Sequence, residues 1–446
     1  MVDQQRLGMK NGKKIGLCLS GGGYRATIYH LGAFRKLREL GLLDKIDVIS
    51  SISGGSITNA FYGLNKDNFE AFEKGLLEAT ETNIIRGVLR SWKLRLILLF
   101  AISGWLGSIA IAWNYGSFSV LLPSIIYPVV IGLLLYFFQF KVSISNSIAG
   151  LLGEKFFQNK TLKDLPDTPH ILINATNIDT GRHFSFSQVK MGDSKYTHNH
   201  TKERIDFKHE DFPIAHAVLA SACFPSVINP IEIGKEHYKN KEHSEIVTPL
   251  LIDGGVYDNQ GIHKLTHVKS SYKCDIVIVS DAGTGMKKIM KCRNSIHLLL
   301  NTIELLMNRI KNFLMIHNIY DTPKDHFIAY QSLTWTVDGC LCGFINALID
   351  GNVRDEVIDA HGISKADISN KNRNNLESFM KGKVDYEKMQ VASLSDGEYE
   401  TICNISTSLK PLSQKQIEVL IKQAEVLTEI QLKLYCPFLF DKGKLC

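Results

Sequence analysis

Two strand–turn–helix units near the start of the chain constrain its fold more than any other feature. Residues 14–20 form an apolar run typical of a buried strand, and the glycines Gly21 to Gly23 that follow open an amphipathic helical pattern. Residues 46–49 form a second β-branched run, which leads into a Ser/Gly-rich turn around Ser53 and another helical pattern. This repeated order of strand, turn and helix is typical of an α/β protein with a parallel sheet.

The serine turn has the features of a nucleophile elbow. Residues 51–55 read Ser-Ile-Ser-Gly-Gly, so Gly55 matches the last glycine of the G-x-S-x-G pattern while Ser51 replaces the first. A serine at a sharp strand-to-helix turn is exposed at the end of its sheet, where a substrate can approach it. We therefore expect Ser53 to act as a nucleophile.

Two further features supply the other groups that acyl transfer requires. Consecutive glycines at a helix N-terminus leave backbone N–H groups unobstructed, and the positive end of the helix dipole favours an oxyanion there. Far downstream, Asp253 stands between an apolar strand pattern and a pair of glycines, at 254 and 255. Hydrogen-bond donors, a nucleophile and a base together fit acyl transfer.

Five sequence blocks, in their order along the chain, resemble the patatin-like phospholipase family. They extend over roughly residues 13–265 and comprise the glycine loop 20–26, the elbow 51–55, and the segments 174–181, 217–225 and 253–255. The resemblance implies a three-layer α/β fold with a central, mostly parallel sheet, and hydrolysis of lipid acyl esters by a Ser–Asp dyad. Nothing in the sequence indicates a metal or another cofactor. In this chain we expect an apolar helical hairpin to interrupt the fold.

The resemblance assigns roles to individual positions. Ser51 stands where glycine is usual in the family and Ala26 where glycine is common. Because both are small, we expect the geometry to be kept. The implied catalytic dyad is Ser53 with Asp253 as its base, and the implied oxyanion hole is formed by the amides around Gly22, Gly23 and Tyr24, with Arg25 beside them.

An uncharged stretch separates the serine elbow from the later blocks. Residues 96–140 contain no Asp, Glu, Lys, Arg or His. The polar turn at 114–116 divides them into halves of about 18 and 24 residues, close to the roughly 20 apolar residues that a membrane-spanning helix needs. Basic residues flank the stretch on both outer sides, which predicts a hairpin with both ends on the cytosolic side.

The dyad restricts how such a hairpin can be inserted. Ser53 precedes the uncharged stretch and Asp253 follows it, yet the two must meet, so the chain crosses a bilayer twice or not at all. Pro123 and Pro128 interrupt the second half and leave a hairpin that enters and leaves the same leaflet as an alternative. A buried hairpin in the core of a large globular protein is the other alternative.

Length and composition bound the organisation of the chain. A chain of 446 residues is longer than one core usually organises, and its formal net charge of +6 shows no basic cluster typical of nucleic-acid binding. Nine cysteines without framework spacing and a polar N-terminus without a signal sequence indicate a reducing compartment. The predicted domains are 1–90 and 142–345 for the catalytic domain, 91–141 for the hairpin and 346–446 for a helical C-terminal region.

These features predict a membrane protein whose catalytic domain lies on the cytoplasmic side. Its expected partners are membrane phospholipid as substrate and the lipid bilayer, with no nucleic acid. A lipase that faces its own membrane would be toxic if unrestrained, so we expect a regulatory ligand, a partner or homo-oligomeric assembly to control it.

Several alternatives fit parts of the sequence. Gly21, Gly23 and Ala26 also satisfy the G-x-G-x-x-A fingerprint of dinucleotide-binding folds, but the second strand does not end in the acid that would hold a ribose. Asp281 is an alternative base, and His216 is a candidate third member of a triad. A catalytically inactive membrane-anchored scaffold, or an acyltransferase that uses the same dyad, also remains open.

Overall fold

The protein is described by a computed structural model that covers residues 12–89, 144–197, 204–225, 228–284, 294–321 and 325–440, with short pieces between residues 99 and 132. The described residues form one nine-stranded sheet. Its strands are β1 (Ile15–Leu19), β2 (Val48–Ser51), β3 (His170–Asn177), β4 (Arg182–Phe186), β5 (Met191–Asp193), β6 (Ile231–Glu232), β7 (Leu250–Ile252), β8 (Ile276–Asp281) and β9 (Phe327–Ser332).

The centre of the sheet is parallel and its other end is antiparallel. The strand order is β5-β4-β3-β2-β1-β8-β9, with β7 also beside β3 and β6 beside β7. Strands β3, β2, β1, β8 and β9 pair in parallel, whereas β4, β5, β6 and β7 pair antiparallel with their neighbours. This arrangement confirms the predicted α/β fold with a mostly parallel central sheet.

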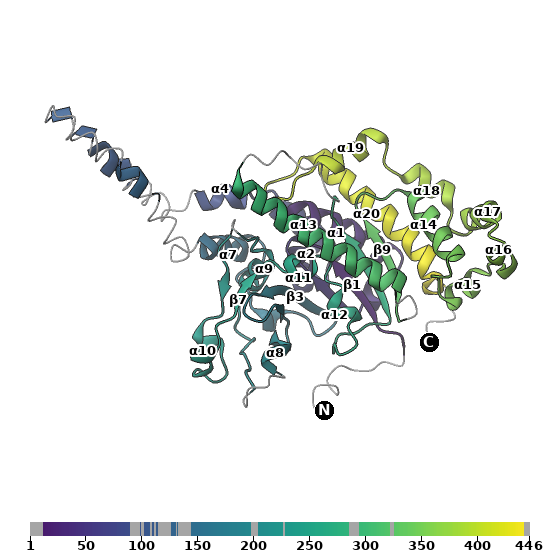
Figure 1. Ribbon diagram of the computed structural model, residues 1–446, viewed down its shortest axis with the longest axis horizontal. Helices are drawn as coiled ribbons and strands as arrows, with labels where there is room; N and C mark the ends of the chain where they lie inside the picture. The colour runs from purple at the N-terminus through teal and green to yellow at the C-terminus, as the bar shows by residue number, and fades with distance from the viewer. Residues whose placement is uncertain are drawn as a thin grey trace.

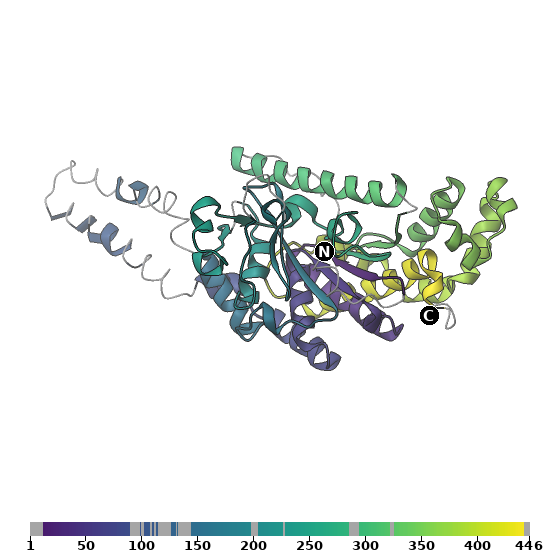
Figure 2. The same cartoon turned by 90° about the horizontal axis from the view of Figure 1, so that it is seen from below.

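Helices cover both faces of the sheet, as the layers in Figures 1 and 2 show. Along β1, Leu17 and Leu19 pack into the core that contains residues of α1 and α20, whereas Cys18 packs on the other face, with Leu265 of α12. This alternation follows from the two-residue period of a strand. The helices before the C-terminal region, together with α20, are α1 (Gly23–Glu39), α2 (Gly54–Asn65), α3 (Phe69–Thr80), α4 (Ile84–Leu89), α7 (Ile144–Lys155), α8 (Ser194–Thr197), α9 (Ile214–Ala222), α10 (His243–Ile246), α11 (Gly255–Asp258), α12 (His263–Thr266), α13 (Ser295–Ile316) and α20 (Gln414–Tyr435).

The C-terminal helices lie against the start of the chain. A Cβ atom on Gly32 of α1 would lie 2.5 Å from the carbonyl oxygen of Ile421 in α20, so the two helices pack backbone to backbone. An ion pair of 3.0 Å between Lys36 and Glu429 adds to this contact. Figure 1 shows α20 beside the helices that precede it in the chain, and its end at Tyr435 packs against Phe344 of α14 (Val337–Ile349). The other helices of this region are α15 (Asp355–His361), α16 (Lys365–Ser369), α17 (Arg373–Lys383), α18 (Tyr386–Ala392) and α19 (Asp396–Asn404).

The prediction of a membrane-spanning hairpin is wrong. Within the described part of the chain, no helix combines the length and the apolar character that crossing a bilayer requires. The two longest helices, α13 and α20, each carry several charged side chains. Most of residues 96–140 lie outside the described residues, and the described pieces include only short helical stretches such as 102–107 and 126–130. The predicted membrane localisation is corrected by the same finding.

Candidate active site

The ends of two strands meet at one edge of β3. Ile173 pairs with Ser51 of the parallel strand β2, and Thr176 pairs with Ile252 of the antiparallel strand β7. Because β4 pairs along the opposite edge of β3, both β2 and β7 lie on the same edge and run toward each other. Ser53 and Asp253 follow the ends of these two strands. The topology therefore brings together two residues that are far apart in the sequence.

The backbone of Ser53 is strained. Its φ of 49° and ψ of −118° lie in a region that residues other than glycine rarely adopt. Such conformations cost about 1–3 kcal/mol and persist only where the surroundings fix them. Here the N–H of Ser53 donates to the hydroxyl of Ser221 in α9 at 2.8 Å, and that hydroxyl donates to the carbonyl of Asn174 at 2.6 Å. Ser221 therefore ties the elbow to β3.

Small residues let the elbow pack closely against its neighbours. A Cβ atom on Gly54 would lie 2.2 Å from the carbonyl oxygen of Gly23, and one on Gly55 would lie 2.6 Å from that of Leu19. Ser51, which replaces the usual glycine, is accommodated because its buried hydroxyl donates to the carbonyl of Leu172 at 3.0 Å. This substitution therefore adds a hydrogen bond between β2 and β3.

Asp253 is buried beside Ser53. Its carboxylate accepts a hydrogen bond from the N–H of Gly255, at 2.7 Å, and lies close to the Ser53 side chain. Burial raises the pKa of Asp253 to about 7, although Gly255 and Ser53 both act to lower it. Met307 of α13 lies over the turn, because its Cε atom is 2.8 Å from the position of a Cβ atom on Gly255. The carboxylate is thus shielded from water and poised to exchange a proton near neutral pH.

The glycine loop lies against the elbow, and its amides are not equivalent. A Cβ atom on Gly21 would lie 3.3 Å from the Cβ of Ser53. No described residue accepts a hydrogen bond from the N–H of Gly22 or Gly23. By contrast, the N–H of Tyr24 donates to the carbonyl of Ser408 at 2.9 Å, and the guanidinium of Arg25 donates to that of Ile405 at 2.8 Å. Of the four predicted oxyanion-hole positions, the first two therefore have free amides.

The alternative base and the candidate third triad member lie in other surroundings. The carboxylate of Asp281 is buried in an ion pair with Lys311 of α13, at 3.2 Å, and accepts the Tyr330 hydroxyl at 2.8 Å. Lys311 and these hydrogen bonds hold the pKa of Asp281 below its usual value in spite of burial. The ring of His216 packs against Phe212, and no described contact joins it to the dyad. Asp281 thus helps to hold α13 on the sheet.

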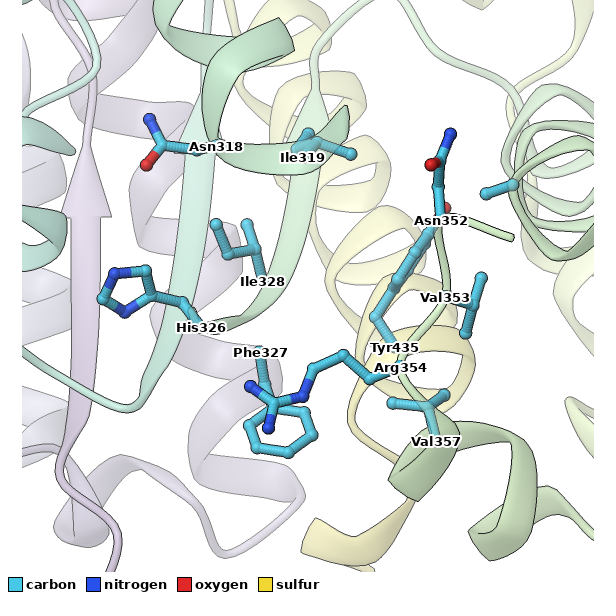
Figure 3. Close-up of a pocket in the computed structure, with 11 residues that line it drawn as sticks. Asn318, Ile319, His326, Phe327, Ile328, Asn352, Val353, Arg354, Val357 and Tyr435 are labelled. Carbon is cyan, nitrogen blue, oxygen red and sulfur yellow. The ribbon is translucent and has the colours of Figure 1, made fainter. Parts of the chain in front are cut away.

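Metal-ligating groups and cavities are the other features that could form a site in the described residues. No group of three or more His, Cys, Asp or Glu side chains in that part of the chain is arranged to hold a metal ion. Figure 3 shows a cavity between β9 and the C-terminal helices, where Arg354 lies over the ring of Phe327. Phe327 pairs with Ile276 at the beginning of β8, whereas Ser53 follows the end of β2, so the cavity lies at the opposite end of the parallel strands from Ser53.

The comparison with known families agrees with this geometry. Residues 17–266, more than half of the chain, match the model of the patatin-like phospholipase family. The chain belongs to this family. Phospholipase is the activity that the description of the family names. No curated protein sequence matches the chain.

Two solved structures are similar to this patatin-like protein over 98% of its length. Human GIVD cytosolic phospholipase A2 is 11% identical, with a TM-score of 0.46, and 64% of its chain is covered, so the present chain spans somewhat less than two thirds of that enzyme. VipD from Legionella pneumophila is 13% identical, with a TM-score of 0.29 and 92% of its chain covered.

Sequence reasoning missed several residues that support the site of this family member. Ser221 falls within a segment that resembles the family, but no local signal identifies its hydroxyl as the support of Ser53. Met307 belongs to a helix that begins about 40 residues after Asp253, and the pairing of Lys311 with Asp281 fixes where that helix lies. Ile405 and Ser408 contact the glycine loop through backbone carbonyls, which no side-chain pattern can reveal.

Proposed function

We propose that the protein is a lipid acyl hydrolase that cleaves carboxylic ester bonds of glycerophospholipids through an acyl-enzyme on Ser53. The observation that carries this proposal is the contact between a strained serine and a buried carboxylate whose pKa is raised to about 7. A nucleophile beside a base of matched pKa, with free backbone donors close by, is the arrangement that ester cleavage requires.

In the first half of the reaction, the Ser53 Oγ attacks the ester carbonyl carbon while Asp253 takes the hydroxyl proton. The carbonyl oxygen becomes an oxyanion, which accepts hydrogen bonds from the N–H groups of Gly22 and Gly23. Collapse of the tetrahedral intermediate breaks the bond to the alcohol oxygen, and the proton held by Asp253 passes to this leaving group. The products are a lysophospholipid and an acyl ester on Ser53.

In the second half, water repeats the sequence in reverse. Asp253 takes a proton from the water as its oxygen attacks the acyl carbon, and the same two amides hold the second oxyanion. Expulsion of the Ser53 oxygen, which recovers the proton from Asp253, releases the fatty acid. An alcohol in place of water would give acyl transfer instead, so the acceptor depends on what reaches the acyl-enzyme.

The raised pKa of Asp253 predicts how the rate depends on pH. A general base works only when it is unprotonated, so kcat/KM is expected to rise with pH through about 7 and then level off. With one titrating base, the value at pH 5 should be about 100-fold below the plateau. Initial rates on a soluble, uncharged ester between pH 4.5 and 9 measure this profile, and rates that stay level down to pH 5 would show that burial does not raise the pKa of the base.

The direct test of the proposed function combines labelling with product analysis. A fluorophosphonate probe is expected to modify the native chain at Ser53, as located by mass spectrometry of the labelled peptide. The same protein should release free fatty acid from dispersed phosphatidylcholine. Ser53→Ala should abolish both signals, whereas Ser369→Ala, an exposed serine on α16, should change neither.

Fluorophosphonate labelling and product analysis together also distinguish the proposed hydrolase from an inactive scaffold and from an acyltransferase. Labelling at a different serine would refute the assignment of the nucleophile. Absence of labelling in a folded protein would favour an inactive scaffold. Labelling with transfer of the acyl group to added glycerol, without free fatty acid, would indicate an acyltransferase.

A further inference from the structure

The connection between α19 and α20 crosses the glycine loop. Residues 405–408, which we call the strap, supply two backbone carbonyls to the start of α1. That of Ser408 accepts the N–H of Tyr24 at 2.9 Å, and that of Ile405 accepts the guanidinium of Arg25 at 2.8 Å. The second contact joins residues 380 positions apart. The strap also lies outside residues 17–266, the part of the chain that matches the family.

The strap touches the loop backbone as well as these donors. A Cβ atom on Gly23 would lie 2.5 Å from the carbonyl oxygen of Ser408 and 2.9 Å from its nitrogen. Only a glycine allows this approach. Gly23 is therefore held between the strap on one side and Gly54 of the elbow on the other, since a Cβ on Gly54 would lie 2.2 Å from the Gly23 oxygen.

Arg25, which donates to the strap, is buried and does not face solvent. Its side chain is only 4% exposed, and one of its terminal nitrogens lies 3.3 Å from the position of a Cβ atom on Gly22. Burial lowers the pKa of Arg25 to about 10, with Asp281 and Glu304 acting to raise it, so the guanidinium is charged at neutral pH. Burying the charge of Arg25 costs free energy. Removing the guanidinium would leave the carbonyl of Ile405 without its hydrogen-bond donor.

The strap is itself fixed at both ends. Ile405 is buried in the main core, and α20, which follows the strap, packs backbone to backbone on α1 through Ile421 and Gly32. The side chain of Gln423 in α20 donates to the carbonyls of Leu333 and Trp335, each at 2.8 Å. A connection between fixed elements can hold its carbonyls in one place, as preorganised sites require.

We propose that the strap positions the glycine loop for catalysis. It engages the amide of Tyr24 and the side chain of Arg25, so that the peptide planes of Gly22 and Gly23 keep their N–H groups directed at the developing oxyanion. Arg25 is then a positioning residue, and the C-terminal region completes the oxyanion hole from a distance. This inference rests on the proposed function for its chemical meaning, but the contacts can be tested without any reaction.

The test uses the full chain and four variants. Arg25→Met removes the donor to Ile405, and Arg25→Lys keeps a cation that can reach the same carbonyl. Ser406→Gly with Thr407→Gly, both exposed, loosens the strap without removing a buried contact. Arg35→Met is the matched control, because Arg35 lies on the same helix and pairs with Glu425 at the surface.

Two quantities are measured for each variant. One is the deuterium exchange of peptides within residues 20–30, and the other is the rate at which a fluorophosphonate labels Ser53.

In Arg25→Met we expect the amides of the glycine loop to exchange at least tenfold faster than in the native chain. The rate of Ser53 labelling should fall by about 10–100-fold, which is a smaller effect than the 10²–10³-fold loss caused by removing a whole oxyanion-hole donor. Arg25→Lys should recover most of the labelling rate, and Arg35→Met should match the native chain. If Arg25→Met does not fold, the double glycine variant decides, with the same direction of change. The proposal would be overturned if the loop amides of the variant exchanged at the native rate. It would also be overturned if they exchanged faster while Ser53 was still labelled at the native rate. If the native chain is not labelled, the proposed function fails, and the exchange comparison still tests the strap.

Discussion

Asp253→Asn is expected to lower kcat/KM for ester hydrolysis by about 10²–10⁴-fold, the range that general-base catalysis contributes. Asparagine keeps the shape of the side chain and can still accept the N–H of Gly255, but it cannot take the proton of Ser53. The buried position leaves little room for water to replace the base. Initial rates at pH 8 on a soluble ester, above the midpoint of about 7, measure the loss.

The same variant should not destabilise the protein, which separates a chemical defect from a folding defect. The pKa of Asp253 is raised from 3.8 to about 7, so the folded state binds its proton more tightly than the unfolded state. Its contribution to stability is full below pH 3.8 and is lost as pH rises through about 7. At pH 8 a neutral asparagine removes the cost of a buried charge, so Tm should equal or exceed that of the native chain.

A matched control is available at the opposite end of the parallel strands. Asp275 precedes β8 and accepts the backbone N–H of Lys14 at 2.8 Å in an exposed position. Asp275→Asn should leave kcat/KM within about twofold, because a surface substitution rarely has a large effect. If Asp253→Asn retained more than a tenth of the native rate with native Tm, Asp253 would not be the base, and the buried Asp281 would have to be reconsidered.

Gly54→Ala is expected to lower kcat/KM by about 10²–10³-fold, comparable to the loss of one oxyanion-hole donor. The new methyl group would lie 2.2 Å from the carbonyl oxygen of Gly23 and 2.7 Å from its nitrogen. Backbone atoms cannot yield as a flexible side chain does, so the glycine loop must move away from the elbow. The displaced peptide is the one that carries a proposed donor. Stability should also fall, by about 1–3 kcal/mol as for other overpacked sites.

Gly343→Ala provides the comparison for this substitution. Gly343 lies within α14, and a Cβ atom there would meet nothing within 4 Å. Alanine should therefore stabilise the helix by about 0.5–1 kcal/mol and leave the rate unchanged. Thermal melts and ester hydrolysis on the two variants measure both effects. Native activity in Gly54→Ala would mean that the loop and the elbow are not coupled as the geometry indicates.

The sequence predicted those parts of the fold whose signals are local. The apolar runs at 14–20 and 46–49 became β1 and β2, each followed by a helix, because strand and helix periods are written in neighbouring residues. The resemblance to the family implied that Ser53 and Asp253 meet, and the structure places both after strands that end at one edge of β3. Their catalytic roles, like those of Gly22 and Gly23, stay predictions until the variants are measured.

What the sequence could not predict depends on contacts between distant segments. Asp281 ends an apolar strand and Asp253 follows one, and only the position of Lys311 distinguishes the paired carboxylate of Asp281 from that of Asp253, which is poised for proton transfer. The different surroundings of the Gly22 and Tyr24 amides arise from a carbonyl at position 408. The error over residues 96–140 had another cause. An uncharged stretch of sufficient length is compatible with a membrane span but does not establish one.

Because β2 and β7 converge on one edge of β3, the length of β3 between them sets the distance between Ser53 and Asp253. Only Asn174 and Ala175 separate the positions that pair with the two strand ends, a rise of about 10 Å from Ile173 to Thr176. The distance between nucleophile and base thus depends on the number of residues in this part of β3. It does not depend on the side chains that shape a substrate pocket. The pocket can diversify freely, whereas one inserted residue in β3 would separate the pair by about 3.3 Å more and end their contact.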